Sequence, residues 1–166
     1  MRLALLLTLT LTLAAAEPGA VAVLVPTAGN TVSGTVVFTA IPGGLHAHAH
    51  VEGLKAGSHH GFHIHEFGDL RSSDGSSAGG HFNPEGHHHG SPGSGEHHAG
   101  DLGNVIADAS GIAELDLDLP GLAVLTGPTA IAGHSVVLHA SEDDLTSQPV
   151  GNAGARIAVG AIGLAK

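Results

Sequence analysis

The sequence contains no cysteine, no tryptophan and no tyrosine, and it has few basic residues. Without cysteine the chain forms no disulfide bond, so another interaction has to hold its loops in place. Lysine and arginine together number 5 against 15 aspartates and glutamates, and the formal net charge is −10. A chain this acidic is not expected to bind nucleic acid or an anionic membrane surface.

Long apolar runs are also scarce, and the one present lies at the start of the chain. Residues 3–16, LALLLTLTLTLAAA, follow Arg2 and end in an A-x-A pattern before Glu17. This arrangement is typical of a cleaved secretory signal peptide. The alternative is an uncleaved membrane anchor, but a bilayer span needs about 20 apolar residues. We therefore expect a signal peptide at 1–16, a mature domain at 17–166, export to a periplasm or the extracellular space, and no membrane association after cleavage.

Short apolar segments rich in valine, isoleucine and leucine make up most of the remaining chain, with glycine and other turn residues between them. Their lengths and flanking residues predict strands, and no window of helical length keeps a 3.6-residue period. The pattern favours an antiparallel β-sandwich or barrel. The segments lie at 20–25, 31–41, 45–54, 61–67, 103–108, 112–119, 134–140 and 156–163.

One long segment, residues 68–102, has no strand pattern and is rich in glycine, serine and histidine. A loop of this length in a compact domain is usually functional or disordered. It supplies His81, the run 87–89, the pair 97–98 and, near its end, Asp101. Imidazole is the commonest metal ligand and suits copper and zinc, so this loop is a candidate for metal binding.

Further histidines fall in the predicted strands. His63 and His65, in GFHIHEFGD, are two residues apart, so they share one face of a strand, with Ile64 on the opposite face toward the core. His139 likewise alternates with the apolar residues of SVVLHA. These histidines and the loop are sufficient for a metal cluster. The residues alone leave one alternative open, a solvated histidine-rich loop that binds metals loosely.

Five motifs stand in the order found in the copper/zinc superoxide dismutases: GFHIHEFGD, GGHFNP, HAGDLGN, GHSVVLHA and GNAGARIAVGAIG. The chain resembles this family over nearly all of residues 17–166. The resemblance implies a Greek-key antiparallel β-sandwich or flattened barrel of about eight strands with a long metal-binding loop. It also implies a secreted enzyme that converts superoxide to oxygen and hydrogen peroxide by cycling between Cu(II) and Cu(I), as a monomer or a homodimer.

Carried over position by position, the resemblance also implies two metal sites. Arg156 matches the arginine that holds the anionic substrate, and Asp143 matches the carboxylate that links the two sites by orienting their histidines. His81 would bridge the two metals and transfer a proton during catalysis. The implied copper ligands are His63, His65, His81 and His139, the implied zinc ligands are His81, His89, His98 and Asp101, and the neighbours expected to be solvated are His87, His88 and His97.

The chain departs from the family pattern at two places near this site. Members of the family have a disulfide that ties the long loop to the last strand and helps to position the arginine. The matching positions here are Gly75 and Val159, so the bridge is absent. The loop between His139 and Arg156 is short, and it carries three consecutive acidic positions within SEDD but no lysine.

A third departure is the segment LHAHAHVE, which has no role in the family pattern. His46, His48 and His50 alternate there with apolar residues, so we expect the histidine face to be exposed to solvent. Residues two apart on one face of a strand lie roughly 6.5–7 Å apart, which leaves a weak additional metal site as one hypothesis. For the whole protein, the alternative function is a non-catalytic copper- or zinc-buffering protein on the dismutase fold.

Overall fold

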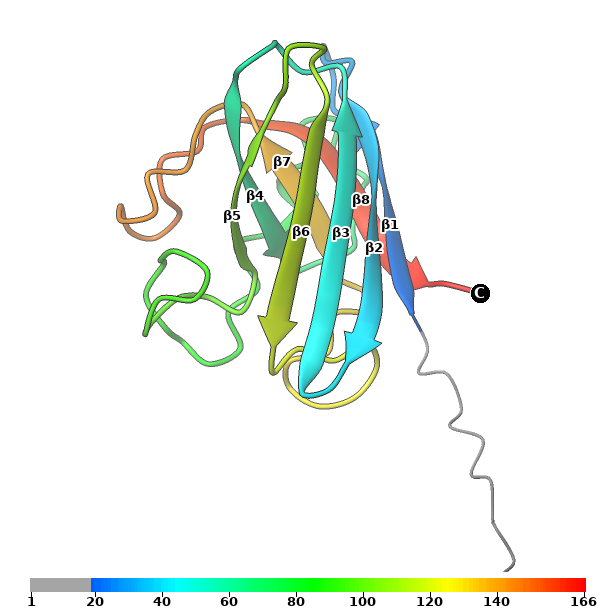
Figure 1. The fold of residues 1–166 in the computed structure, drawn as a ribbon, viewed down its shortest axis with the longest axis vertical. Coiled ribbons are helices and arrows are strands. Elements are labelled where there is room, and N and C mark those ends of the chain that lie inside the picture. Colours follow the sequence, from blue (N-terminus) through cyan, green and yellow to red (C-terminus); the bar gives the residue numbers. More distant parts are fainter. Residues whose placement is uncertain (1–18) are drawn as a thin grey trace, which may run out of the picture.

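The short apolar segments form eight β-strands in the computed structural model, which describes residues 19–166 (Figure 1). Each predicted segment corresponds to one strand, and no end differs by more than two residues. The strands are β1 (Ala20–Pro26), β2 (Ser33–Ile41), β3 (Gly44–Glu52), β4 (His59–His65), β5 (Asp101–Ile106), β6 (Ala113–Pro120), β7 (Ser135–His139) and β8 (Arg156–Leu164). The predicted signal peptide at 1–16 lies outside the described residues.

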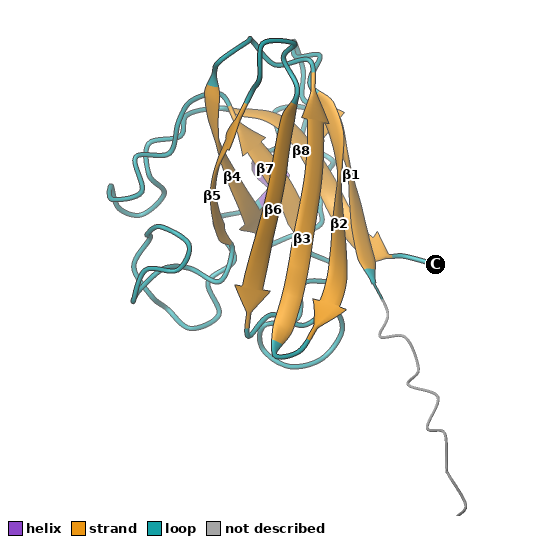
Figure 2. Cartoon of the chain, viewed as in Figure 1, coloured by secondary structure: helices purple, strands orange, loops and turns teal. Residues whose placement is uncertain are grey.

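Regular helix is almost absent from this part of the chain. A single 3₁₀ turn at Ser76–Ala78 interrupts the long loop, and Figure 2 shows strands joined by extended loops. Among the described residues, no helix has the length and apolarity needed to cross a membrane. This agrees with the absence of a helical period in the sequence.

The strands form one sheet in the order β5-β4-β7-β8-β1-β2-β3-β6, and every neighbouring pair is antiparallel. Figure 1 shows β1, β2, β3 and β6 as one layer and β4, β5, β7 and β8 as a second layer behind it. The pairings of β3 with β6 and of β4 with β7 join strands that are not consecutive, as in a Greek key. The predicted flattened, eight-stranded Greek-key barrel is therefore confirmed.

The core fills the space between the two layers and is built mainly from small and branched side chains. The two largest residues at its centre, Phe38 and Phe62, are fully buried. On β3, Ala47, Ala49 and Val51 point inward and are also fully buried. This alternation places every second residue of β3 on the outer face, as the sequence predicts.

The β4–β7 region differs because it is buried on both faces. Ile64 points into the core, while His63 and His65 point away from it and would be exposed without further cover. Two loops provide that cover: the long loop at 66–100 and the loop at 140–155 (Figure 1). The candidate site lies in the layer between the sheet and these loops.

Candidate metal centre

A first group of donor atoms gathers where the long loop crosses the outer face of β4 and β7. A bridge between the backbones of His65 and His81 brings the loop against the end of β4. All four side chains of the group are buried, and one ligand atom from each lies within 4.8 Å of the others. The members are His63, His65, His81 and His139, which the sequence predicts as copper ligands.

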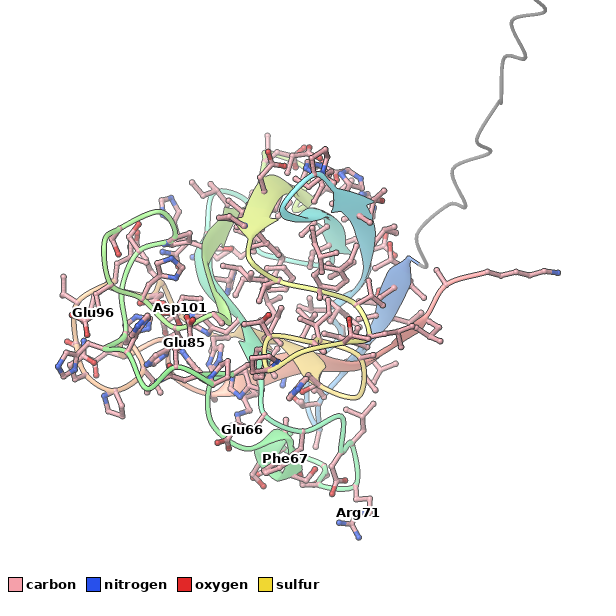
Figure 3. The ribbon with its side chains drawn as sticks, turned by 90° about the horizontal axis from the view of Figure 1, so that it is seen from below. Glu66, Phe67, Arg71, Glu85, Glu96 and Asp101 are labelled. Atoms are coloured by element: carbon pink, nitrogen blue, oxygen red, sulfur yellow. The ribbon has the colours of Figure 1, made fainter. Side chains whose placement is uncertain are left out.

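A second group shares His81 with the first. The Oδ1 atom of Asp101 lies 2.9 Å from His81 Nδ1, 3.0 Å from His89 Nδ1 and 3.2 Å from His98 Nδ1. A tetrahedral zinc site with bonds of about 2.0–2.1 Å spaces its ligand atoms about 3.3–3.4 Å apart, so the donors are already close to that geometry. Figure 3 shows Asp101 on the inner side of the long loop, whereas Glu96 lies on its outer side.

In three of the four imidazoles of the first group, one ring nitrogen is fixed by an acceptor outside the group. Such contacts hold the ring in one orientation and place the proton on the contacting nitrogen. The anchors are Asp143 Oδ2 for His63 Nε2 at 2.7 Å, the Gly79 carbonyl for His65 Nδ1 at 3.0 Å and the Gly154 carbonyl for His139 Nδ1 at 3.0 Å.

The other nitrogens of these rings point toward one another without protons between them. His65 Nε2 and His139 Nε2 lie 3.3 Å apart. His63 Nδ1 and His81 Nε2 are buried and have no hydrogen-bond partner. Bare imidazole nitrogens that converge in a buried space lose their hydration, and a metal cation satisfies them. The residues therefore fit a bound metal ion.

Burial also keeps these rings in the protonation state that ligates metal. It lowers the pKa of His63 to about 3 and the pKa of His139 to about 4, and it lowers the pKa of His65 well below its ordinary value. At neutral pH the three rings are uncharged, and only an uncharged imidazole has a free lone pair. In the second group, burial alone would raise the pKa of Asp101, but contacts from His81 and His98 outweigh it and lower the pKa.

Asp143 connects the two groups. Its Oδ2 accepts a hydrogen bond from His63 Nε2 at 2.7 Å, and its Oδ1 accepts one from His89 Nε2 at 2.9 Å. Asp143 is only 2% exposed. The same carboxylate thus contacts one candidate ligand of each group.

Comparison with known proteins identifies the arrangement. A family model described as copper/zinc superoxide dismutase matches residues 32–162. The chain belongs to the copper/zinc superoxide dismutase family. Membership makes it an oxidoreductase of the superoxide dismutase type, with copper and zinc as cofactors.

Individual relatives agree with this assignment. An extracellular copper/zinc superoxide dismutase of Onchocerca volvulus is 43% identical over 157 residues, covering 88% of this chain and 76% of the relative. Copper/zinc superoxide dismutase 2 of Mesembryanthemum crystallinum is 44% identical over 153 residues, covering 86% and 94%. The crystal structure of the clock protein EA4 superposes with a TM-score of 0.81 at 38% identity, over 91% of this chain and 97% of that one.

Within this dismutase fold, the histidines of the long loop differ in burial. The ligand candidates His89 and His98 are 3% and 6% exposed. Their neighbours His87 and His88 are exposed, and His97 is partly exposed. Burial therefore separates the predicted ligands from the predicted solvated residues within each run.

Two side-chain amides that support the dismutase site are not evident from the sequence. The amide of Asn104 binds both backbone polar groups of Asp143, at 2.8 and 2.9 Å. The amide of Gln148 binds both backbone polar groups of His89, also at 2.8 and 2.9 Å. Each amide clamps one residue from a distant part of the chain, and nothing in the local sequence indicates the partner.

His60 is a further buried residue that sequence reasoning missed. Its Nδ1 donates to the carbonyl of His139 at 2.8 Å, and its Nε2 contacts Ser58 Oγ at 2.7 Å. Since both ring nitrogens are engaged, His60 supports the end of β7 and is not a ligand candidate. His60 lies just before the strand predicted at 61–67, and the sequence pattern gives no signal for these contacts.

Arg156 is held without the family's disulfide. Its guanidinium donates to the carbonyls of Gly75 and Gly79. The Gly79 carbonyl also accepts the hydrogen bond from His65, so one oxygen anchors both side chains. Val159, at the other cysteine position, packs in a small apolar cluster with residues 78 and 137. Backbone carbonyls and apolar packing thus occupy the place of the missing bridge.

Gly151 is required by the close packing around Asp143. Its φ is +68°, a left-handed conformation that favours glycine. A Cβ at this position would lie 1.8 Å from Asp143 Oδ1 and 2.6 Å from His89 Nε2. A side chain here would therefore displace the carboxylate that joins the two metal groups.

We predict that Gly151→Ala weakens metal retention about 10–100-fold, because loss of an outer-shell contact has effects of that size. Chelator competition with the zinc- and copper-loaded protein measures the change. Gly57→Ala is the matched control, since Gly57 has a similar φ of +72° and no atom within 4 Å of the added Cβ. Equal metal loss in both variants would mean that backbone strain, not displacement of Asp143, is responsible.

Proposed function

We propose that the protein is a superoxide dismutase that converts superoxide to oxygen and hydrogen peroxide outside the cytoplasm. The observation that carries the proposal is a single imidazole, His81, shared by two buried groups of donor atoms. The proposed copper ligands are His63, His65, His81 and His139, and the proposed zinc ligands are His81, His89, His98 and Asp101.

The chemistry of each donor set supports this division. Four imidazoles suit copper, whereas three imidazoles and a carboxylate form a closed tetrahedral set that suits zinc. Bound copper supplies the one-electron redox chemistry between Cu(II) and Cu(I), which no side chain of the site can supply. The side chains position the substrate and move protons.

His81 is placed to handle a proton at Nε2. Its Nδ1 faces Asp101 at 2.9 Å, its ring stacks on His63 with 4.0 Å between centroids, and its Nε2 is a buried atom that faces the first group. Hydrogen peroxide formation consumes protons, and this nitrogen can hold one and release it beside the reacting anion. Asp101 holds the His81 ring in position while Nε2 binds and releases that proton.

Arg156 is placed to hold the superoxide anion. Across the β7–β8 pairing it lies opposite His139, and it shares the Gly79 carbonyl with His65. Its positive charge disfavours protonation of the His65 and His139 imidazoles. Burial is the main cause of the lowered pKa values of these two rings, and the charge of Arg156 lowers them further. The same charge attracts an anion at the first group, and the two carbonyl contacts fix its direction.

We expect the copper- and zinc-loaded protein to consume superoxide far faster than the same amount of copper bound to the unfolded chain. Pulse radiolysis of loaded protein measures the rate constant. Arg156→Ala should lower it about tenfold, and His63→Gln should abolish it. His88→Gln is the control, because His88 is an exposed loop histidine outside both groups. Activity no higher than that of copper on the unfolded chain would favour a metal-buffering function instead.

The charge around the site sets a second expectation, which concerns ionic strength. The basic residues within 17–166 are Lys55, Arg71, Arg156 and Lys166. Arg71 is paired with Asp69 at 2.6 Å, and the loop beside the site carries the exposed acids Glu142 and Asp144. Long-range attraction of an anion is therefore weak, and the short-range attraction of Arg156 dominates.

We predict that the rate constant at pH 8 stays flat or rises slightly between about 0.01 and 0.1 M salt. Over this range the Debye length falls from about 30 to about 10 Å, so distant repulsion is screened more than the contact with Arg156. Stopped-flow or pulse-radiolysis rates across the salt series measure this. A steep fall with salt would reveal a positive funnel toward copper and contradict the charge argument.

Export rests on two observations. Residues 1–16 have the pattern of a signal peptide, with a mature domain at 17–166, and one relative is named as an extracellular enzyme. We expect the exported protein to begin at Glu17 when expressed in a secreting host. N-terminal sequencing of the secreted fraction tests this; a product that stays in the cytoplasm with residues 1–16 intact would contradict it.

A further inference from the structure

The outer face of β3 and β6 carries a second collection of metal-ligating side chains, away from the dismutase site. The strand register places three histidines of β3 directly opposite three carboxylates of β6. Their side chains are 35–51% exposed for the histidines and 51–70% exposed for the acids. This histidine–carboxylate ladder consists of the pairs His46–Asp118, His48–Asp116 and His50–Glu114.

The ladder is made of other residues than the buried groups and lies on the other layer of the barrel. Figure 1 shows β3 and β6 in the layer opposite the one that contains β4 and β7, and the buried groups lie under the loops on that other layer. The inward neighbours of the ladder on β3, such as Ala47 and Ala49, are fully buried in the core. The ladder and the buried groups therefore share no residue, although Asp118, at one end of the ladder, lines the same pocket as Asp101.

One carboxylate oxygen in the ladder contacts two imidazoles at once. Asp116 Oδ1 lies 3.2 Å from His46 Nε2 and 2.9 Å from His48 Nδ1. The other nitrogen of His46, Nδ1, lies 2.7 Å from Asp118 Oδ1. An ionised carboxylate only accepts hydrogen bonds, so both contacts of His46 require an N–H on each ring nitrogen.

A neutral His46 has only one N–H and cannot satisfy both carboxylates. The single N–H then stays on Nδ1, which makes the closer contact, with Asp118. Nε2 then presents a bare lone pair to an oxygen that also has lone pairs, only 3.2 Å away. The arrangement needs a positive charge at this point, which either a proton or a metal cation supplies.

We propose that His46, His48 and Asp116 form a third metal site, which takes a divalent copper or zinc ion from solution. The donor atoms are His46 Nε2, His48 Nδ1 and Asp116 Oδ1. The two oxygen–nitrogen separations, 3.2 and 2.9 Å, are near the about 3.3 Å between ligand atoms of a tetrahedral site. Solvent completes the coordination, because the face is open.

Outer carboxylates support the proposed ligands. Asp118 accepts the Nδ1 proton of His46, which leaves Nε2 free to ligate. Glu114 Oε2 lies 3.7 Å from His48 Nε2, which is too far for a hydrogen bond but adds negative charge beside that ring. Contacts of this kind orient ligating histidines and raise their basicity. Three closely spaced carboxylates also make the surface favourable for a cation.

The site binds more weakly than the buried groups. Among the described residues, only those two groups have all their ligand atoms within 4.8 Å of one another. His46 and His48 must therefore rotate toward a common ion, and exposed side chains lose rotamer freedom when they do so. Of the two metals, we expect copper to bind this site more tightly, since nitrogen and oxygen donors bind Cu²⁺ more strongly than Zn²⁺.

The test uses the full protein with both buried groups already saturated with copper and zinc. Cu²⁺ alone is titrated at pH 8 by calorimetry and followed by electron paramagnetic resonance. This pH matters because contacts with Asp118 and Asp116 raise the pKa of His46, so that protons compete at lower pH. We expect one further equivalent to bind wild-type protein, and at least tenfold weaker binding in H46Q/H48Q.

Two further variants make the result specific. Asp116→Asn keeps the size of the side chain but removes its charge, and should also weaken binding at least tenfold. His59→Gln should leave binding unchanged, because His59 is a similarly exposed histidine with a single carboxylate partner, Glu142. Absence of a further equivalent, or equal affinity in wild type and H46Q/H48Q, would overturn the proposal. Superoxide dismutation by H46Q/H48Q should stay at the wild-type rate, which keeps this site distinct from the proposed enzyme.

Discussion

The structure depends on a set of buried imidazole nitrogens that face one another with no proton between them. Isolated polar atoms of this kind are costly to bury, by at least about 1–3 kcal/mol each when they lack a partner. Their other ring nitrogens are already committed to Asp143 and to the carbonyls of Gly79 and Gly154. The rings cannot turn outward without breaking those contacts, so a cation is the remaining way to satisfy them.

The same constraint explains how the two covering loops, at 66–100 and 140–155, stay on the barrel without a disulfide. Each loop contributes residues to the buried layer, and each is also tied by backbone contacts to a distant side chain. Gln148 clamps His89 across 59 positions of sequence, and Asn104 clamps Asp143 across 39. In the proposed enzyme, ligation by the histidines of the long loop would couple the free energy of metal binding to the ordering of that loop. Hydrogen bonds and ligation share the role that a covalent bridge has elsewhere in the family.

The strands were predictable because their signal is local. Alternation on β3 gave both the buried alanines and the exposed histidines, and turn residues marked the ends of each strand to within two positions. Residue patterns alone indicated a metal cluster, and the family motifs predicted the individual ligands, whose side chains the structure brings into two groups. Burial then separated His89 from His87 and His88.

The supporting contacts were not predictable for a physical reason. Asn104, Gln148 and His60 act through hydrogen bonds to the backbone of residues far along the chain, and a backbone group has no sequence signature. The fold alone brings each pair together. The replacement of the family's bridge by the Gly75 and Gly79 carbonyls is of the same kind, because every residue carries a backbone carbonyl and its identity does not indicate the contact.

The Gly79 carbonyl accepts two hydrogen bonds, one from His65 and one from Arg156. In the proposed enzyme this oxygen therefore positions both a copper ligand, His65, and the arginine that holds the substrate anion, Arg156. A displacement of the loop at this point changes the tilt of one ring and the reach of the guanidinium together. Reduction potential and anion affinity would then vary as a linked pair, and sequence changes near Gly79 would be unable to tune either property alone.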